Sequence, residues 1–392
     1  MATDIAAYLF HEGPDDNPKT LAGLSSLYSQ GSKIYGQGFV FDDNDADANP
    51  LGVMRSILAN QPTLSSRIHP YIGGREVNDD PCHLHSRFVI NLSDLQSEQA
   101  LEPFGPLTAI VREKVKPIRD ALGNNPVNRP LKRRWWAYQA HRPDFYSQIA
   151  PLSRVLVLSK VTTHFALTFL PTGMVYSEKL ILFALSEFSA FCLLQSRVYE
   201  VWARFFSATL GDALQYSLSD SFQTFPLLDY HLHDALERKG QQYFEARAVL
   251  MAQSGKGLTE TYNAFCSPAE RSRDIVRLRD LHDDMDRAVL DAYGWSDLNP
   301  ACEFFAEFQD EEGEETESGR TRPKKFRYRW PDEVHDEILA RLLELNRARA
   351  EDESQSVPAT SLAKTVGKRG RKSTKTAPVT SPNLFEVKEP AE

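Results

Sequence analysis

Apolar and polar positions alternate along this chain with two different periods, and each period predicts a different kind of element. Between residues 153 and 185, runs rich in β-branched and aromatic side chains flank the turn Pro171-Thr172-Gly173, a pattern typical of strands. The segments 64–72 and 87–92 have the same character, and Gly73-Gly74 follows the first of them as a turn. These segments predict a unit built around a sheet.

Helical spacing dominates the later part of the chain. Residues 186–208 carry apolar side chains on one broad face, which predicts one long helix. From Leu232 to Tyr293 apolar positions repeat at three and four, with Gly294 as a stop. A last amphipathic helix is predicted from Pro331 to Arg349. We therefore expect an α+β fold, with a mixed or antiparallel sheet, then an α-helical domain and a disordered tail.

Composition places the chain among globular proteins, with 41% hydrophobic and 25% charged residues. Its formal net charge of −9 argues against nucleic acid, but an acidic run at Asp310–Glu317 and basic runs at 112–142 and 364–375 make the charge uneven. Four widely spaced cysteines favour a reducing cytoplasm over a disulfide framework. The strongest apolar run, Val155–Leu170, is interrupted by polar residues, so we expect no membrane span.

The stretch from Arg112 to Arg142 combines cations with aromatic rings. Only Glu113 and Asp120 oppose its positive charge. Cations neutralise phosphates and flat rings stack on bases, so the stretch is a candidate nucleic-acid surface. The structural alternative is a solvated helix face followed by two core tryptophans. The residues that carry the candidate surface are Arg112, Lys114, Lys116, Arg133, Arg134, Trp135 and Trp136.

The segment Ser159–His164 is predicted to be a hairpin with small polar side chains at adjacent strand ends. Thr162, Thr163 and His164 are suited to hydrogen bonds with base edges, and Lys160 to a guanine or a phosphate. An ordinary half-exposed strand explains the same pattern, so both interpretations stay open.

Histidines near acidic residues suggest metal ligands, but none has the second paired element of a closed zinc site. The candidates are His83 and His85 beside Cys82, His231 and His233 beside Asp234, and His282 with Asp286 one helical turn later. Solvated helix charge explains the last group as well, and we expect no metal site. The run Lys368–Lys372 is similar to the basic core of an AT-hook, although no prolines flank it.

No known catalytic motif occurs in the sequence. It contains no Asn/Asp-Pro-Pro-Tyr/Phe tetrapeptide, no Gly-rich cofactor loop after a strand, and no GxSxG, HExxH or Walker motif. We therefore expect no catalytic residue and no bound cofactor in this chain.

Several distinctive strings follow one another along the chain: Ser32–Phe39, His69–Asn78, Arg87–Asn91, Val111–Pro117, Trp135-Trp136 with His141-Arg142-Pro143, Leu170–Gly173, Phe222–Pro226, Gly257–Asn263, Leu281-His282 with Met285-Asp286, and Asp291–Trp295. In content and order they resemble MmeI-like adenine-specific DNA methyltransferases of restriction–modification systems. The resemblance spans roughly residues 5–350. The first strings resemble the region just after the family's catalytic tetrapeptide.

The resemblance implies a particular order of domains. It also implies that the family's methyl-transfer residues have no counterpart in this chain. S-adenosylmethionine is then expected in a missing domain or a partner subunit. The implied units are the end of a methyltransferase domain with a connector at 1–65, a target-recognition domain at 66–228, a C-terminal helical domain at 229–309, a linker at 310–326, a helix at 327–350 and a disordered basic tail at 351–392.

The leading hypothesis is a module that recognises double-stranded DNA for a methyltransferase partner, in a restriction–modification or phage-defence system. Arg112, Lys114, Lys116, Arg133 and Arg134 would hold phosphates. The base readers would be Lys160, Thr162, Thr163, His164, Asp212 and Gln215, the last two because a carboxylate accepts from cytosine and an amide pairs with adenine.

Two alternatives remain at this point. One is a self-contained metal-dependent nuclease that uses His231, His233, His282 and Asp286. The other is an adaptor that docks on a partner through an exposed edge at Asp4–Phe10 and its helical domain.

Overall fold

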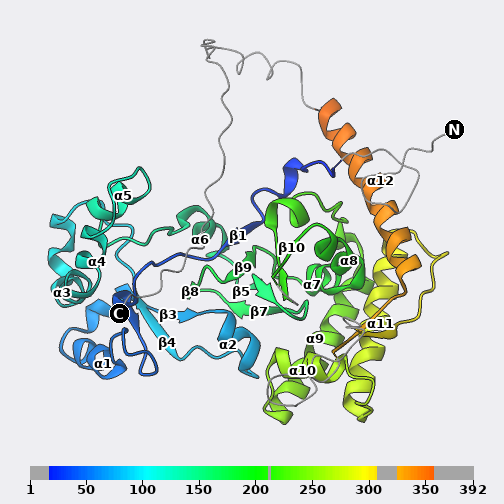
Figure 1. The fold of residues 1–392 in the computed structure, drawn as a ribbon, viewed down its shortest axis with the longest axis horizontal. Coiled ribbons are helices and arrows are strands. Elements are labelled where there is room, and N and C mark those ends of the chain that lie inside the picture. The colour runs from blue at the N-terminus through cyan, green and yellow to red at the C-terminus, as the bar shows by residue number, and fades with distance from the viewer. Residues whose placement is uncertain (1–16, 211–212, 307–324, 357–392) are drawn as a thin grey trace, which may run out of the picture.

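The computed structural model describes residues 17–210, 213–306 and 325–356. It has the predicted α+β fold, with an elongated shape in which a smaller lobe stands beside a larger, helix-rich part (Figure 1). Each part has its own hydrophobic core. No helix among these residues is long and apolar enough to cross a membrane. Several sequence predictions lie outside the described residues, namely the Asp4–Phe10 edge, Asp212, the Asp310–Glu317 run, the Lys368–Lys372 motif and most of the tail.

The smaller lobe is built on a four-stranded sheet with the order β2-β4-β3-β8. Its strands β3 and β8 are parallel and the other pairs are antiparallel. Helices on this lobe bury their apolar sides against the sheet. The elements are β2 Val40–Phe41, α1 Leu51–Asn60, β3 Ile68–Ile72, β4 Arg87–Ile90, α3 Gly105–Lys114, α4 Lys116–Asp120, α5 Asn128–Arg133 and β8 Val175–Tyr176.

The larger part contains an antiparallel sheet with the order β1-β9-β5-β7. Almost all side chains of its three long strands are buried, which explains why their sequences are nearly continuous apolar runs. The strands predicted within 153–185 are confirmed. The elements are β1 Tyr28–Gln30, α2 Gly74–Asp79, α6 Pro143–Ile149, β5 Arg154–Ser159, β7 Leu167–Pro171 and β9 Leu180–Phe183.

The single helix predicted over 186–208 is wrong, because the chain forms two helices, α7 Phe188–Gln195 and α8 Arg197–Phe205. Ser196 separates them in an extended conformation, with ψ 156°, and its hydroxyl accepts a hydrogen bond from the Tyr199 amide. This break turns α8 away from α7.

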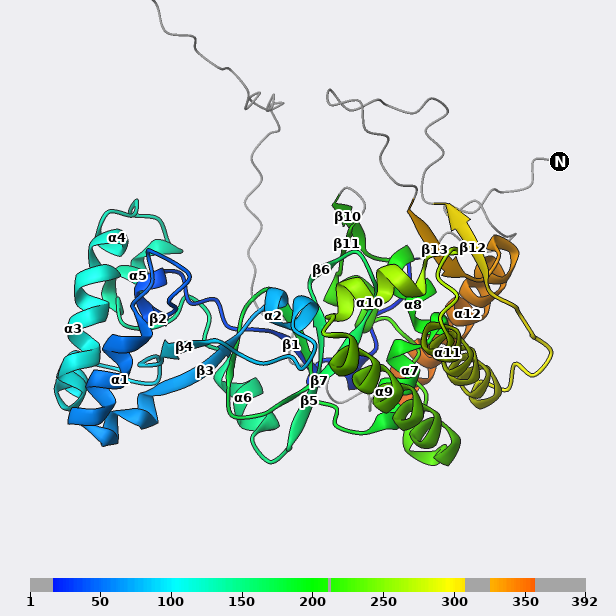
Figure 2. The same cartoon turned by 90° about the horizontal axis from the view of Figure 1, so that it is seen from below.

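The predicted hairpin at Ser159–His164 is also wrong. Its second half, β6 Val161–Thr162, pairs instead with β11 Ala213–Gln215, which pairs in turn with β10 Ala208–Leu210. The three strands form a small antiparallel sheet. In Figure 2 the β10–β11 ribbon stands out from the body of the molecule.

The helical prediction for 232–293 is confirmed by α9 Asp234–Ser254, α10 Leu258–Phe265 and α11 Arg273–Ala292. Gly294 ends this region with a φ of +77°, which favours glycine. The last helix, α12 Asp332–Ser356, is longer than predicted and packs on α8. A two-stranded ribbon, β12 Glu303–Ala306 with β13 Phe326–Arg329, was not predicted.

Candidate nucleic-acid interface

The two tryptophans of the basic–aromatic stretch lie in the core of the smaller lobe. Trp135 is 1% exposed and Trp136 2%, and their rings form an edge-to-face pair with centroids 5.6 Å apart. Their indole N–H groups donate to Glu98 Oε1 at 2.7 Å and to the Leu95 carbonyl at 3.0 Å. Rings so placed cannot stack on bases. The stacking interpretation is therefore wrong, and the structural alternative is correct.

Three of the five predicted phosphate contacts are engaged within the lobe. Arg134 donates from Nη2 to the Ser93 and Leu95 carbonyls. Lys114 Nζ donates to the Ala48 carbonyl at 2.7 Å, and Lys116 pairs with Asp120 at 2.6 Å. These contacts compete with phosphate binding, because a cation that satisfies internal acceptors has less to offer a phosphate, and the role of all three stays a prediction. The other two, Arg112 and Arg133, are exposed, and their role stays a prediction.

Another cation of this stretch, Arg119, organises the lobe from inside. Its side chain is fully buried, and burial lowers its pKa to about 10, so it stays charged at neutral pH. Its guanidinium joins two chain segments that are far apart in the sequence. It donates to the backbone carbonyls of Ile34, Tyr35, Arg134, Trp135 and Ala137.

The β6–β11 pairing brings predicted base readers from two distant segments together. Gln215 lies opposite Val161, and the Tyr216 amide donates to the Lys160 carbonyl at 2.9 Å. Gln215 is exposed, and Lys160 is half-buried. The other predicted reader of this turn, Asp212, lies outside the described residues.

Two cations that the sequence did not single out lie beside Lys160. Arg75 on α2 and Lys179 before β9 are both exposed, and they line a cavity of about 290 Å³ with Val161 and Ser159. The Lys160 amide donates to the Lys179 carbonyl at 2.8 Å. We use the name ribbon groove for this cavity together with the β6–β11 pairing next to it, which shares Val161 with it. Its residues are Arg75 and Lys179, which line the cavity, and Lys160, Thr163 and Gln215, which lie in or beside the pairing.

The predicted base readers His164 and Thr162 make contacts within the protein beside the ribbon groove. The Nε2 atom of His164 lies 2.8 Å from Asn263 Oδ1 and its Nδ1 3.9 Å from Cys266 Sγ. Burial lowers its pKa to about 4, so the ring is neutral at neutral pH. The Thr162 hydroxyl donates to the His164 carbonyl at 2.7 Å. These contacts help to hold the loop in place, and a contact of either residue with a base stays a prediction.

Helix α10 closes the far side of this loop. A second cavity, of about 210 Å³, lies between Thr163, Leu258 and Asn78. Gly257 permits the close approach of α10 to α2, because a Cβ there would lie 2.4 Å from the Asn78 carbonyl oxygen. The segment Ser159–His164 thus lies against both helices, through the Ser159 hydroxyl bonded to Asn78 Oδ1 and through His164 beside Asn263.

The metal-dependent nuclease hypothesis lacks its site. His282 Nδ1 lies 3.3 Å from Asp286 Oδ2, but Asp286 also forms an ion pair with Arg197. Within the part of the chain that the structure describes, no three His, Cys, Asp or Glu side chains are grouped to hold a metal ion. Among the described residues, His231, His233, His282 and Asp286 are therefore not gathered into one metal site.

The basic–aromatic stretch and the ribbon groove are well separated. Helices α3, α4 and α5 lie at one end of the molecule in both views, while β10 and β11 lie nearer the other (Figures 1 and 2). The structure therefore does not unite the predicted phosphate contacts with the predicted base readers on one small surface.

Two comparisons with known proteins give matches, and both concern MmeI. Residues 37–229 match the family model described as the target recognition domain of MmeI. The chain is also similar to a solved structure of the Type IIL restriction–modification enzyme MmeI in complex with DNA, with a TM-score of 0.57 and 18% identity. That match covers 89% of this chain and 39% of the MmeI chain, so the chain spans about two-fifths of its length. No curated protein sequence matches.

Proposed function

Because residues 37–229 form an MmeI-type target recognition domain, we propose that this chain binds duplex DNA and selects the sequence on which a methyltransferase domain acts. The observation that carries the proposal is the ribbon groove. All five of its residues lie within the matched range, and they come from separate segments that the fold brings together. A recognition domain needs such a convergence of cations and hydrogen-bonding side chains.

The shape of the β10–β11 ribbon supports base recognition. The major groove of DNA admits a two-stranded ribbon, and the side-chain amide of glutamine pairs with the adenine edge there. Gln215 is exposed on this ribbon. In our proposal Gln215 and Thr163 contact base edges, and Lys160 a guanine or a phosphate. Arg75 and Lys179 hold phosphates beside them.

The finer part of the proposal concerns the reaction. We propose that the methylated base is adenine, and that S-adenosylmethionine and the transfer residues belong to a separate domain or subunit. The sequence contains no Asn/Asp-Pro-Pro-Tyr/Phe tetrapeptide, which supports placing the transfer residues outside this chain. The choice of adenine rests on the resemblance of the sequence to adenine-specific methyltransferases. Such an enzyme must extrude its target base, so the recognition module has to hold the flanking duplex meanwhile. A cytoplasmic restriction–modification or phage-defence system would use this arrangement.

Selection of binding sites from random duplexes tests the proposal. We expect the purified chain to enrich one short sequence, and Lys160→Ala and Gln215→Ala to change the preference at separate positions. Thr209→Ala is the matched control, because Thr209 is exposed on the same ribbon but pairs with Leu214 on its other face. A sequence preference that survives both changes would refute the assignment of readers, and failure to bind duplex DNA at all would refute the function.

A further inference from the structure

The small sheet β10-β11-β6 has an inner face and an outer face. Residues directly opposite one another in an antiparallel pair point to the same face, and neighbours along a strand point to opposite faces. Leu214 lies opposite both Thr209 and Thr162, so these three share one face. Leu214 is 2% exposed and belongs to the hydrophobic core, which makes this the inner face. The residues of the outer face are Val161, Ala208, Leu210, Ala213 and Gln215.

The outer face is apolar apart from Gln215. Leu210 is 61% exposed and Val161 40%, although large aliphatic side chains are ordinarily buried. Ala208, opposite Gln215, is exposed as well, and Ala213 is half-buried opposite Leu210. Apolar side chains gathered on one exposed face indicate a surface that binds a partner.

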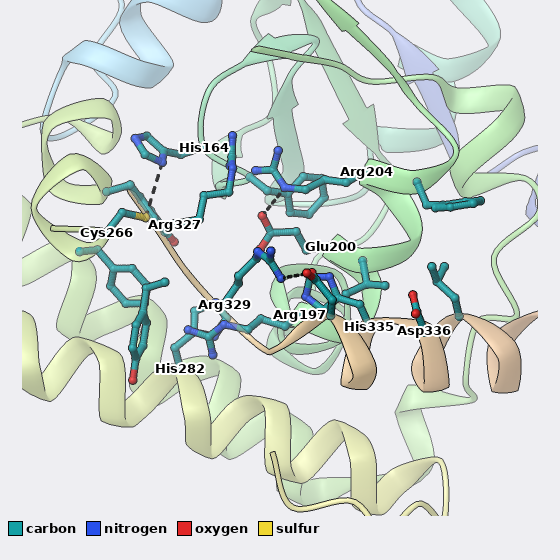
Figure 3. Close-up of a pocket in the computed structure, with 18 residues that line it drawn as sticks. His164, Arg197, Glu200, Arg204, Cys266, His282, Arg327, Arg329, His335 and Asp336 are labelled. Atoms are coloured by element: carbon teal, nitrogen blue, oxygen red, sulfur yellow. Dashed lines mark hydrogen bonds and ion pairs between the residues drawn. The ribbon is translucent and has the colours of Figure 1, made fainter. Parts of the chain in front are cut away.

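Contacts with the body of the protein hold this sheet in one position. The Thr163 carbonyl, just after β6, accepts hydrogen bonds from Arg327 Nη1 at 3.2 Å and Arg204 Nη2 at 3.4 Å. Figure 3 shows these two arginines along the wall of a cavity of about 350 Å³. Just after β11, the Tyr216 hydroxyl is hydrogen-bonded to the Tyr199 hydroxyl on α8. A sheet fixed in this way loses little freedom when its outer face meets a rigid partner.

The charges beside the outer face favour DNA as that partner. Val161 lines the cavity of the ribbon groove together with Arg75 and Lys179, which are both exposed. One carboxylate, Asp79, lines the same cavity. Cations at the border of an apolar face suit the phosphates on each side of the major groove, which is wide enough for a two-stranded ribbon. The outer face therefore continues the ribbon groove toward the base edges.

Thymine is the base that suits the apolar side chains of this face. It alone carries a methyl group in the major groove, at C5, whereas the other bases present hydrogen-bond donors and acceptors there. We propose that the outer face reads thymine through its C5-methyl group, with Leu210 and Val161 as the contacts. This inference rests on the proposed function, since it requires duplex DNA in the ribbon groove.

The register of the sheet limits where the thymines lie. Val161 lies directly opposite Gln215, and Leu210 lies two residues along β10 from Ala208, the other partner of Gln215. Two residues of a strand span about 7 Å, and successive base pairs are about 3.4 Å apart. In a ribbon that lies along the groove, the thymine at Leu210 is therefore about two base pairs from the base that Gln215 contacts.

Replacement of thymine by uracil tests the inference, because it removes only the methyl group and leaves the hydrogen-bonding edge intact. Duplexes that carry the enriched sequence, with uracil in place of each thymine in turn, are compared by fluorescence anisotropy. One buried methyl group contributes about a fourfold difference in affinity. We expect about fourfold weaker binding at one or two thymines, and no change at the others.

Two variants assign this loss to the outer face. Leu210→Ser removes the aliphatic side chain at the end of β10, and Val161→Thr replaces one methyl group by a hydroxyl of similar size. In at least one of them the thymine and uracil duplexes should bind equally, whereas a merely structural role would weaken both duplexes alike. Leu232→Ser is the matched control, because Leu232 is 77% exposed and lies beyond residues 37–229. Thermal unfolding checks that each variant is folded.

The outcomes separate this inference from the proposed function. If the chain enriches a sequence that contains no thymine, or one in which uracil changes nothing, the inference is overturned and the proposed function stands. A uracil effect that persists in both variants also overturns the inference, because another surface then contacts the methyl group. A chain that binds no duplex, or enriches no sequence, overturns both. Self-association that Leu210→Ser abolishes without a change in DNA binding would assign the outer face to a second copy of the chain and overturn the inference.

Discussion

The basic–aromatic stretch and the ribbon groove use positive charge in opposite ways. In the stretch, Arg119 and Arg134 donate to backbone carbonyls and the two tryptophans are buried, so part of the charge stabilises the lobe itself. In the groove, Arg75 and Lys179 are exposed around a cavity. The stretch is continuous in the sequence, whereas the groove is assembled from separate segments. A high density of positive residues along the sequence is thus a poor guide to which surface of the protein binds DNA.

Removal of Arg119 should have the largest effect, on stability rather than on binding. Arg119→Ala leaves five carbonyls without this donor and opens a cavity. We expect a loss of about 3–5 kcal/mol in the free energy of unfolding, because buried carbonyls lose their donor and the missing side chain leaves a cavity. Chemical denaturation measures it. Arg133→Ala is the control, because Arg133 is exposed, and an equal loss in both variants would contradict our account of the stretch.

Gln215→Ala should have the next largest effect, on sequence discrimination. A good bidentate contact with a base contributes about 1–3 kcal/mol of discrimination against the wrong base. We expect this loss at one position of the site, with little change in affinity for random duplexes. Competition binding against single-base variants of the site measures it. A uniform loss across all sequences would instead show that Gln215 contacts the backbone of DNA.

Stability should fall as the pH decreases from about 6.5 to 4. Burial lowers the pKa of His83, His164 and His335 to about 4, so the unfolded chain binds protons in this range before the folded chain does. Above pH 6.5 all three are neutral in both states and their contribution is constant. His164→Gln should reduce the slope of stability against pH, and His231→Gln, at an exposed position, should not. Denaturation midpoints across this range measure both, and a steeper slope in His164→Gln would contradict the assignment.

Lys114→Ala should have the smallest effect on DNA affinity. Its ammonium group donates to the Ala48 carbonyl, so we expect a change below about 0.5 kcal/mol, within the range of ordinary surface substitutions. Fluorescence anisotropy with a labelled duplex measures it. A tenfold loss of affinity for the duplex, with unchanged stability of the protein, would show that Lys114 does contact a phosphate.

Much of the fold could be predicted from the sequence, namely the elements whose apolar pattern continues over many residues. The buried strands around 153–185 and the helices of 232–293 follow from apolar periodicity, and the family resemblance followed from strings such as His69–Asn78. The α+β class is correct for the same reason.

The groove itself could not be predicted, because it depends on short pairings between distant segments. Strand β6 has only two residues, and no periodicity indicates that Val161 lies opposite Gln215. Arg75 and Lys179 are isolated cations in segments far apart in the sequence, so their proximity is seen only in the folded structure. The burial of the two tryptophans could not be predicted either, because the neighbouring sequence does not distinguish a ring in the core from a ring that stacks on a base.

The salt dependence of duplex affinity tests most directly whether the ribbon groove holds DNA. The logarithm of the binding constant falls linearly as the logarithm of the salt concentration rises, and each lost phosphate contact makes this line less steep by about 0.9. We expect the triple change of Arg75, Lys160 and Lys179 to glutamine to lower the slope by about 2–3. The matched triple change of Arg112, Lys116 and Arg133 should lower it by less than about 1. The reverse order would contradict the account.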